Sequence, residues 1–300
     1  MTDRPSSTLA LPRRILLATD LRSHGDRAFD RAVQLAQAWR VPLHVVHVLP
    51  RGNEDSWPAT AGQPSWRHGA TTAQRVERQI RRDLCGEVAD LDIHIAEGEP
   101  AEAILETATR EACDLLVLGA SEKPGPGSLG HVIEHLLRKS PASLLVVRDR
   151  PRGDYAHVLV GTDFTAESRH GLTSAATWFP TAQLVLMHVL DIPYRSLWLD
   201  PGHGEDLARL ELATMRSFLD DTPLEHGVRQ RVQPLVEHGH PEIVLREYAI
   251  EQDMDLVVIS AFRRGLAFHL LVGGTSRRIV PAMPCDVLLV RATRDAPATP

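Results

Sequence analysis

The chain has 300 residues, of which 43% are hydrophobic, and it carries a formal net charge of −6. This length is near that at which a chain divides into two domains, each large enough to bury a core. The acidic balance argues against a nucleic-acid-binding protein, which normally presents a basic surface. No apolar run approaches membrane-spanning length, and the first residues lack the apolar core of a signal peptide. The three cysteines are scattered and odd in number, which favours buried free thiols over a disulfide framework. We therefore expect a cytoplasmic protein with no membrane or nucleic-acid partner.

Strand and helix patterns alternate along the first half of the chain. Short apolar or alternating runs predict strands at 15–18, 43–49, 91–95, 115–118 and 144–147. Between them, helical spacing of apolar residues predicts a helix around 29–36, and a first-turn proline predicts a helix that begins at Glu99-Pro100 and reaches at least Ala108. Two further helices are expected over about 72–88 and over 131–139. The polar stretch 51–70 is expected to be a long loop. Alternating strands and helices imply parallel βαβ units with right-handed crossovers.

The same order of segments occurs twice, about 140 residues apart. The run ending in Thr19-Asp20 returns with Thr162-Asp163, and the strand pattern at 43–49 returns at 184–190. A repeat of this length is a whole domain. We therefore expect two tandem domains, 1–149 and 154–300, each an open, doubly wound α/β domain with a five-stranded parallel sheet.

In such sheets, ligands bind beyond the carboxyl ends of the strands, where the strand order reverses. The candidate residues there are Asp20, Gly119 and Gly130 in the first half and Asp163, Thr165 and Ser260 in the second. An aspartate at a strand end can instead cap the following turn. For Asp20 and Asp163 both roles stay open.

Together these blocks resemble the universal stress protein family in its tandem two-domain form. The resemblance spans about 13–291. It rests on four features: the Thr-Asp strand ending, the strand Leu-His-Val-Val-His-Val, a Gly-x-Pro helix start and a closing helix–Pro–strand unit. The closing unit lies at 130–147 and returns at 273–290. It implies a fold of the flavodoxin-like or adenine-nucleotide-hydrolase-like kind and a role in stress response. In that family the edge strand that closes each domain pairs with a second subunit.

Family members that bind ATP carry Gly-x2-Gly-x9-Gly-Ser/Thr after the fourth strand, where glycines let backbone N–H groups approach phosphate. The second half has this spacing, and its candidate residues are Ser260, Arg263, Gly273, Gly274, Thr275 and Arg277. Its arginines could pair with phosphate. The first half keeps Gly119 and Gly130, but it is two residues shorter and has Glu122 at the second glycine, which would repel phosphate. If either half binds ATP or AMP, we expect the second.

Histidines give no clear metal pattern. His47 and His188 lie inside apolar strands, and we expect each to be a core or near-core residue with one hydrogen bond. His131 and His135 share a helix face, and 237–240 holds a second small cluster. Two ligands on a helix rarely bind zinc without a third and fourth, so no metal is expected.

The chain has no P-loop and no Gly-x-Ser-x-Gly pattern. We therefore expect a stress-response protein without strong catalysis, which binds a small ligand or protein partners, with adenine nucleotide in the second half. A weak ATP-hydrolysing or self-phosphorylating enzyme and a nucleotide-free interaction scaffold are the alternatives.

The last strand of each half is an edge, with unpaired backbone groups that need a partner. A fused chain can satisfy both edges internally. We predict that 144–147 pairs antiparallel with 287–290, as an intramolecular pseudo-dimer, and that further dimerisation is open.

Overall fold

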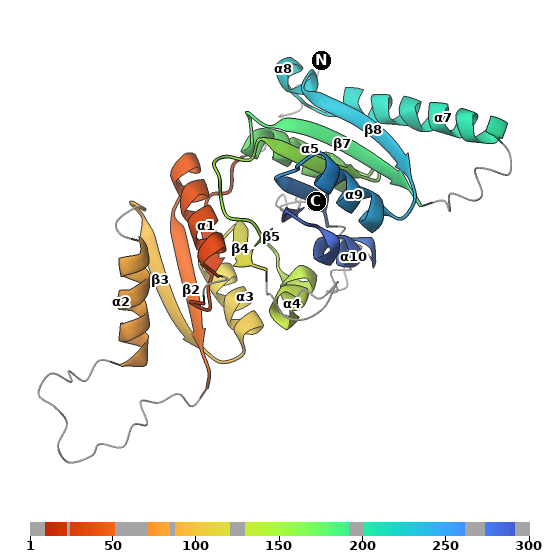
Figure 1. Cartoon of the computed structure of the whole chain (residues 1–300). Helices are drawn as coiled ribbons and strands as arrows, with labels where there is room; N and C mark the ends of the chain where they lie inside the picture. The colour runs from red at the N-terminus through yellow and green to blue at the C-terminus, as the bar shows by residue number, and fades with distance from the viewer. Residues whose placement is uncertain are drawn as a thin grey trace, which may run out of the picture.

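The computed structural model describes residues 10–22, 25–51, 71–84, 88–120, 130–191, 201–261 and 274–291, with the backbone alone for 201–208 and 274–275 (Figure 1). The first half consists of β1 (Ile15–Ala18), α1 (Gly25–Trp39), β2 (Leu43–Leu49), α2 (Thr72–Leu84), β3 (Leu91–Glu97), α3 (Pro100–Arg110), β4 (Leu115–Gly119), α4 (His131–Lys139) and β5 (Ser143–Val147). The second half consists of β6 (His157–Thr162), α5 (Ala166–Trp178), β7 (Gln183–Leu190), α7 (Pro201–Asp220), α8 (His226–Arg229), β8 (Val232–His238), α9 (Pro241–Glu251), β9 (Leu256–Ser260), α10 (Gly274–Ala282) and β10 (Asp286–Val290).

All ten strands form one sheet in the order β3-β2-β1-β4-β5-β10-β9-β6-β7-β8. Within each half the strands are parallel, which confirms the predicted α/β fold. The two halves meet where β5 and β10 pair antiparallel, with Leu145 opposite Leu288. The structure thus contains the strand pairing expected between the two closing edges.

Helices cover both faces of the sheet. One buried cluster contains side chains of α1, α2, α5 and α7, and a second contains side chains of α3, α4, α9 and α10. Successive residues of a strand alternate between these faces, so Leu145 belongs to the first cluster and Leu144 to the second. Because β5 and β10 join the two halves edge to edge, each layer continues across both halves.

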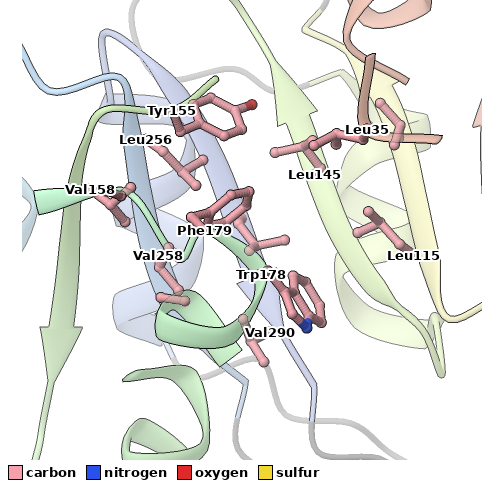
Figure 2. Packing of buried hydrophobic residues seen from close by; sticks show 14 of the residues in the cluster. Leu35, Leu115, Leu145, Tyr155, Val158, Trp178, Phe179, Leu256, Val258 and Val290 are labelled. Atoms are coloured by element: carbon pink, nitrogen blue, oxygen red, sulfur yellow. The ribbon is translucent and has the colours of Figure 1, made fainter. Parts of the chain in front are cut away.

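Side chains of both halves share one core at the junction. The rings of Tyr155 and Phe179 meet edge to face with centroids 5.1 Å apart, and Trp39 of α1 lies 5.8 Å from Trp178 of α5. Figure 2 shows Tyr155, Trp178 and Phe179 beside Leu145 of β5. Burial of this aromatic surface holds the two halves together.

Most predicted bounds agree with the structure to within one residue. The helix predicted over 72–88 is described over Thr72–Leu84; residues 85–87 lie outside the described residues, and Val88 is not helical. The strand predicted over 91–95 continues to Glu97. The second half also departs from a strict repeat, because α7 has 20 residues where α2 has 13. The predicted loop at 51–70 lies almost wholly outside the described residues.

Candidate functional site

A tight turn follows the first strand of each half, at the carboxyl edge of the sheet. The hydroxyl of Thr19 accepts a hydrogen bond from the N–H of Leu21, and that of Thr162 accepts one from Phe164, both at 3.0 Å. Leu21 and Phe164 adopt left-handed backbone conformations, with φ of 57° and 61°. The threonine hydroxyl stabilises a conformation that L-residues adopt at some cost.

The aspartates of these turns cap the backbone. Asp20 accepts a hydrogen bond from the N–H of Arg22 at 3.1 Å, and Asp163 accepts one from Thr165 at 3.2 Å. Thr165 in turn is the N-cap of α5 and accepts a hydrogen bond from the N–H of Ser168. Both aspartates are nevertheless exposed, so capping leaves carboxylate oxygen available at the sheet edge.

Two histidines of the neighbouring strands contact the backbone of the same turns. Nδ1 of His47 lies 2.9 Å from the carbonyl oxygen of Thr19, and Nδ1 of His188 lies 2.7 Å from that of Thr162. Both side chains are only partly accessible. The prediction that each is a core or near-core histidine with a hydrogen bond is confirmed, and the partner is a backbone carbonyl in both halves.

The structure describes some of the residues predicted for the glycine motif and not others. Gly119 and Ser260 end β4 and β9, and Gly130 precedes α4 with φ 78°, where glycine avoids the strain that a side chain would cause. Gly274 begins α10, and the Thr275 backbone lies in its first turn. Arg263 and Gly273 lie outside the described residues.

Ser260, which replaces the first glycine of the motif, turns its side chain toward α5. A methyl group at Gly171 of α5 would overlap the Ser260 hydroxyl. This hydroxyl is buried and has no hydrogen-bond partner among the described atoms. Because α5 and α10 cover opposite faces of the sheet, the Ser260 side chain points away from the face that carries α10.

The helices that follow the two loops differ in charge. The first turn of α4 contains Glu134, whereas that of α10 contains no acidic residue and carries exposed Arg277 at the equivalent position. Arg278 lies 3.5 Å from Glu242 of α9. A helix N-terminus favours anions, and Arg277 reinforces this effect in the second half alone.

The histidine clusters considered from sequence do not converge on a metal site. The rings of His131 and His135 are 6.2 Å apart, and Nε2 of His135 lies 2.9 Å from Oε1 of Glu102. His240 lies 3.2 Å from Asp191. Within the described part of the chain, none of these residues belongs to a group of three or more metal-binding side chains.

A different group was not recognised from the sequence. His44 of β2, Asp92 and His94 of β3, and Glu111, which caps α3, bring ligand-type atoms within 4.8 Å of one another. The rings of His44 and His94 are stacked, with centroids 5.5 Å apart. Burial, together with the nearby His94, lowers the pKa of His44. The Asp-x-His alternation along one strand face is the pattern that could have revealed this cluster.

Comparison with known proteins identifies the family. The sequence model of the universal stress protein family matches twice, over residues 12–148 and 154–291. A curated universal stress protein of Thermus aquaticus is 32% identical over 45% of this chain and 97% of its own length. The stress response protein NhaX of Bacillus subtilis is 27% identical, with the same coverage of both chains.

The fold is found in solved structures as well. The crystal structure of a universal stress protein from Archaeoglobus fulgidus superposes with a TM-score of 0.62 over 93% of this chain and 98% of that one, at 17% identity. Among the described helices, none is long and apolar enough to cross a membrane. The chain belongs to the universal stress protein family and contains two family domains in tandem.

Proposed function

We propose that the second half binds an adenine nucleotide at the carboxyl ends of β6 and β9, and that the protein acts in the cytoplasmic stress response as a ligand-binding protein, not as a catalyst. The observation that carries this proposal is the charge of α10, whose first turn presents Arg277 and no acidic residue. Phosphate is favoured there by the helix dipole and by a guanidinium. The first half has Glu134 at the same position, which disfavours phosphate.

The departure at Ser260 does not oppose the proposal. A glycine in the family motif allows the backbone to come close to a phosphate group. The Ser260 side chain is directed toward Gly171 on the other face of the sheet. Its backbone can therefore approach a ligand on the α10 side as a glycine backbone would.

Asp163 supplies the second anchor in this proposal. Its carboxylate is exposed at the end of the first strand of the second half and is held in place by the N–H of Thr165. A carboxylate at this edge can accept hydrogen bonds from a ribose hydroxyl or an adenine amino group.

The test is equilibrium titration of the full chain with ATP and with AMP. Replacing a charge-assisted hydrogen bond typically weakens binding by about 10- to 100-fold, so Arg277→Gln should lower the affinity by that factor. Asp163→Asn keeps an oxygen for the Thr165 N–H and removes the charge, so it should weaken binding without lowering Tm.

Two matched controls make the result specific. Arg216→Gln removes an exposed arginine of α7, and Asp20→Asn changes the equivalent aspartate of the first half. Both should bind ATP as the unaltered chain does. Equal affinity of Arg277→Gln and the unaltered chain for ATP would contradict the proposed site. If the unaltered chain bound neither ATP nor AMP, the alternative of a nucleotide-free interaction scaffold would replace the proposal.

A further inference from the structure

We propose that the first half binds a zinc-type divalent cation through His44, Asp92 and His94. His44 and Asp92 are the second residues of β2 and β3, and His94 is in the middle of β3, whereas the candidate nucleotide residues lie at the carboxyl ends of the strands. The site is therefore separate from the proposed nucleotide site, and neither proposal depends on the other.

The three ligand atoms already form a triangle of suitable size. Nδ1 of His44 lies 3.2 Å from Nε2 of His94, and Oδ2 of Asp92 lies 3.9 Å and 3.7 Å from these two nitrogens. The centre of this triangle is about 2.1 Å from each atom, which is the usual length of zinc–nitrogen and zinc–carboxylate bonds. Because the planes of the two imidazole rings are only 14° apart, the rings must rotate for both nitrogen lone pairs to point at a cation in this position.

The sheet register sets this arrangement. In the parallel pairing of β2 and β3, His44 stands opposite Asp92, and Val46 stands opposite His94. Asp92 and His94 are two residues apart, so they share the sheet face with His44. Each ligand is therefore carried by a paired strand, which is a rigid support for a metal site.

The donor set indicates the kind of metal. Two imidazole nitrogens and one carboxylate oxygen are typical of zinc sites that leave a fourth position for water or another ligand. His44 is buried, His94 is nearly so, and Asp92 is exposed, with 62% of its side chain accessible. The ion would thus be reached from solvent on the Asp92 side.

Glu111 and Arg110 flank the other nitrogen of His94. Nη2 of Arg110 lies 3.3 Å from Nδ1 of His94, and a guanidinium can only donate, so Nδ1 accepts and Nε2 carries the proton. Metal binding at Nε2 moves this proton to Nδ1, so Arg110, which can only donate, loses its hydrogen bond to Nδ1 and turns away. Oε1 of Glu111, 4.0 Å away, is then the acceptor that holds the ring, as carboxylates do behind metal-bound histidines.

The second half provides an internal comparison. Val185 and Gln233 pair in β7 and β8 as His44 and Asp92 do in β2 and β3, and Leu235 takes the position of His94. Gln252 caps α9 where Glu111 caps α3. The repeat therefore lacks the three ligands and the supporting carboxylate, and we expect one ion per chain.

The experiment uses the metal-free full chain and Zn²⁺ alone, titrated in competition with a chromophoric chelator. Asp92→Asn and His94→Gln should each lower the Zn²⁺ affinity by more than the roughly 10- to 100-fold loss typical of outer-shell partners, and Glu111→Gln should fall within that range. Zn²⁺ should raise the Tm of the unaltered chain and leave that of Asp92→Asn nearly unchanged.

Two features keep this test specific. Asp92 is exposed, so Asp92→Asn should have the same metal-free Tm as the unaltered chain, and a loss of affinity then reports the site and not the fold. His157→Gln, which removes an exposed histidine beside Asp255 in the second half, should bind Zn²⁺ normally. Unchanged affinity in Asp92→Asn and His94→Gln, or no binding of Zn²⁺ to the unaltered chain, would overturn the proposal.

Discussion

The carboxylate of Asp286, the first residue of β10, accepts a hydrogen bond from the backbone N–H of Arg148 at 2.7 Å. At the equivalent place in the other half, the hydroxyl of Ser143 accepts one from the N–H of Arg291 at 3.1 Å. The two bonds are related by the pseudo-twofold symmetry of the β5–β10 pair. Only one of the two acceptors is ionisable, so the junction of the halves carries one buried carboxyl group.

The first prediction concerns pH. Burial raises the pKa of Asp286, although hydrogen bonds from Tyr155 and from the N–H groups of Arg148 and Asp149 oppose this shift. The carboxyl group of Asp286 then binds its proton more tightly in the folded state than in the unfolded state. The stability that this proton contributes is therefore fully present below the ordinary pKa of about 3.9, and it is lost as pH rises through the folded pKa.

Asp286→Asn tests this pH dependence, because the amide keeps an oxygen for both backbone N–H groups and does not titrate. The free energy of unfolding of the unaltered chain minus that of the variant should fall as pH rises above about 3.9. Denaturant unfolding of both proteins at a series of pH values measures this difference in the free energy of unfolding. A difference that is flat or that grows with pH would contradict the raised pKa.

The second prediction concerns backbone protection at the junction. The amides of 144–147 and 287–290 lie in the interior of a ten-stranded sheet, because β5 and β10 pair with each other. Their hydrogen exchange should be slower than that of β3 and β8, the two outer strands. Exchange at β5 and β10 as fast as at the outer strands would mean that the halves do not pair in solution.

The third prediction concerns the shared core. Leu145 is 1% exposed and belongs to the cluster that spans both halves. Leu145→Ala should lower the free energy of unfolding by about 2–5 kcal/mol, through lost apolar burial and the cavity left behind. Leu210→Ala, at a leucine that is 63% exposed, is the matched control and should change it by less than about 0.5 kcal/mol. If Leu145→Ala lowered the free energy of unfolding no more than Leu210→Ala does, the core at the junction would contribute little to stability.

The fourth prediction concerns the thiols. Burial raises the pKa of both Cys113 and Cys285 to about 12, and the two side chains are free. Because the thiolate is the reactive form, neither should react with a thiol reagent in the folded chain at pH 8. The measurement uses Cys85→Ser, since Cys85 lies outside the described residues. Two thiols should appear only in denaturant, and a full equivalent of labelling without denaturant would argue against their burial.

Much of the fold was predictable because local and repeated patterns agree. The helix 131–139 has the bounds expected from its apolar spacing, and α3 and α9 both begin at a proline that suits the first turn. The pairing of β5 with β10 followed from the need to satisfy two edges in one chain.

The cluster around His44 was not predicted, because its members are far apart in sequence. Asp92 and His94 meet His44 only through the register of β2 and β3, and Glu111 joins them from the end of α3. Sequence spacing does not fix strand register across a long connection. The direction of the Ser260 side chain likewise depends on the close packing of Gly171 in α5.

The most direct test of the nucleotide proposal is to denature the full chain, purified without added nucleotide, and to identify the released small molecules by mass spectrometry. We predict ATP, ADP or AMP approaching one molecule per chain, with a marked loss in Arg277→Gln. Finding no nucleotide, together with no change in Tm when ATP is added, would contradict the proposal that the second half is a nucleotide-binding module.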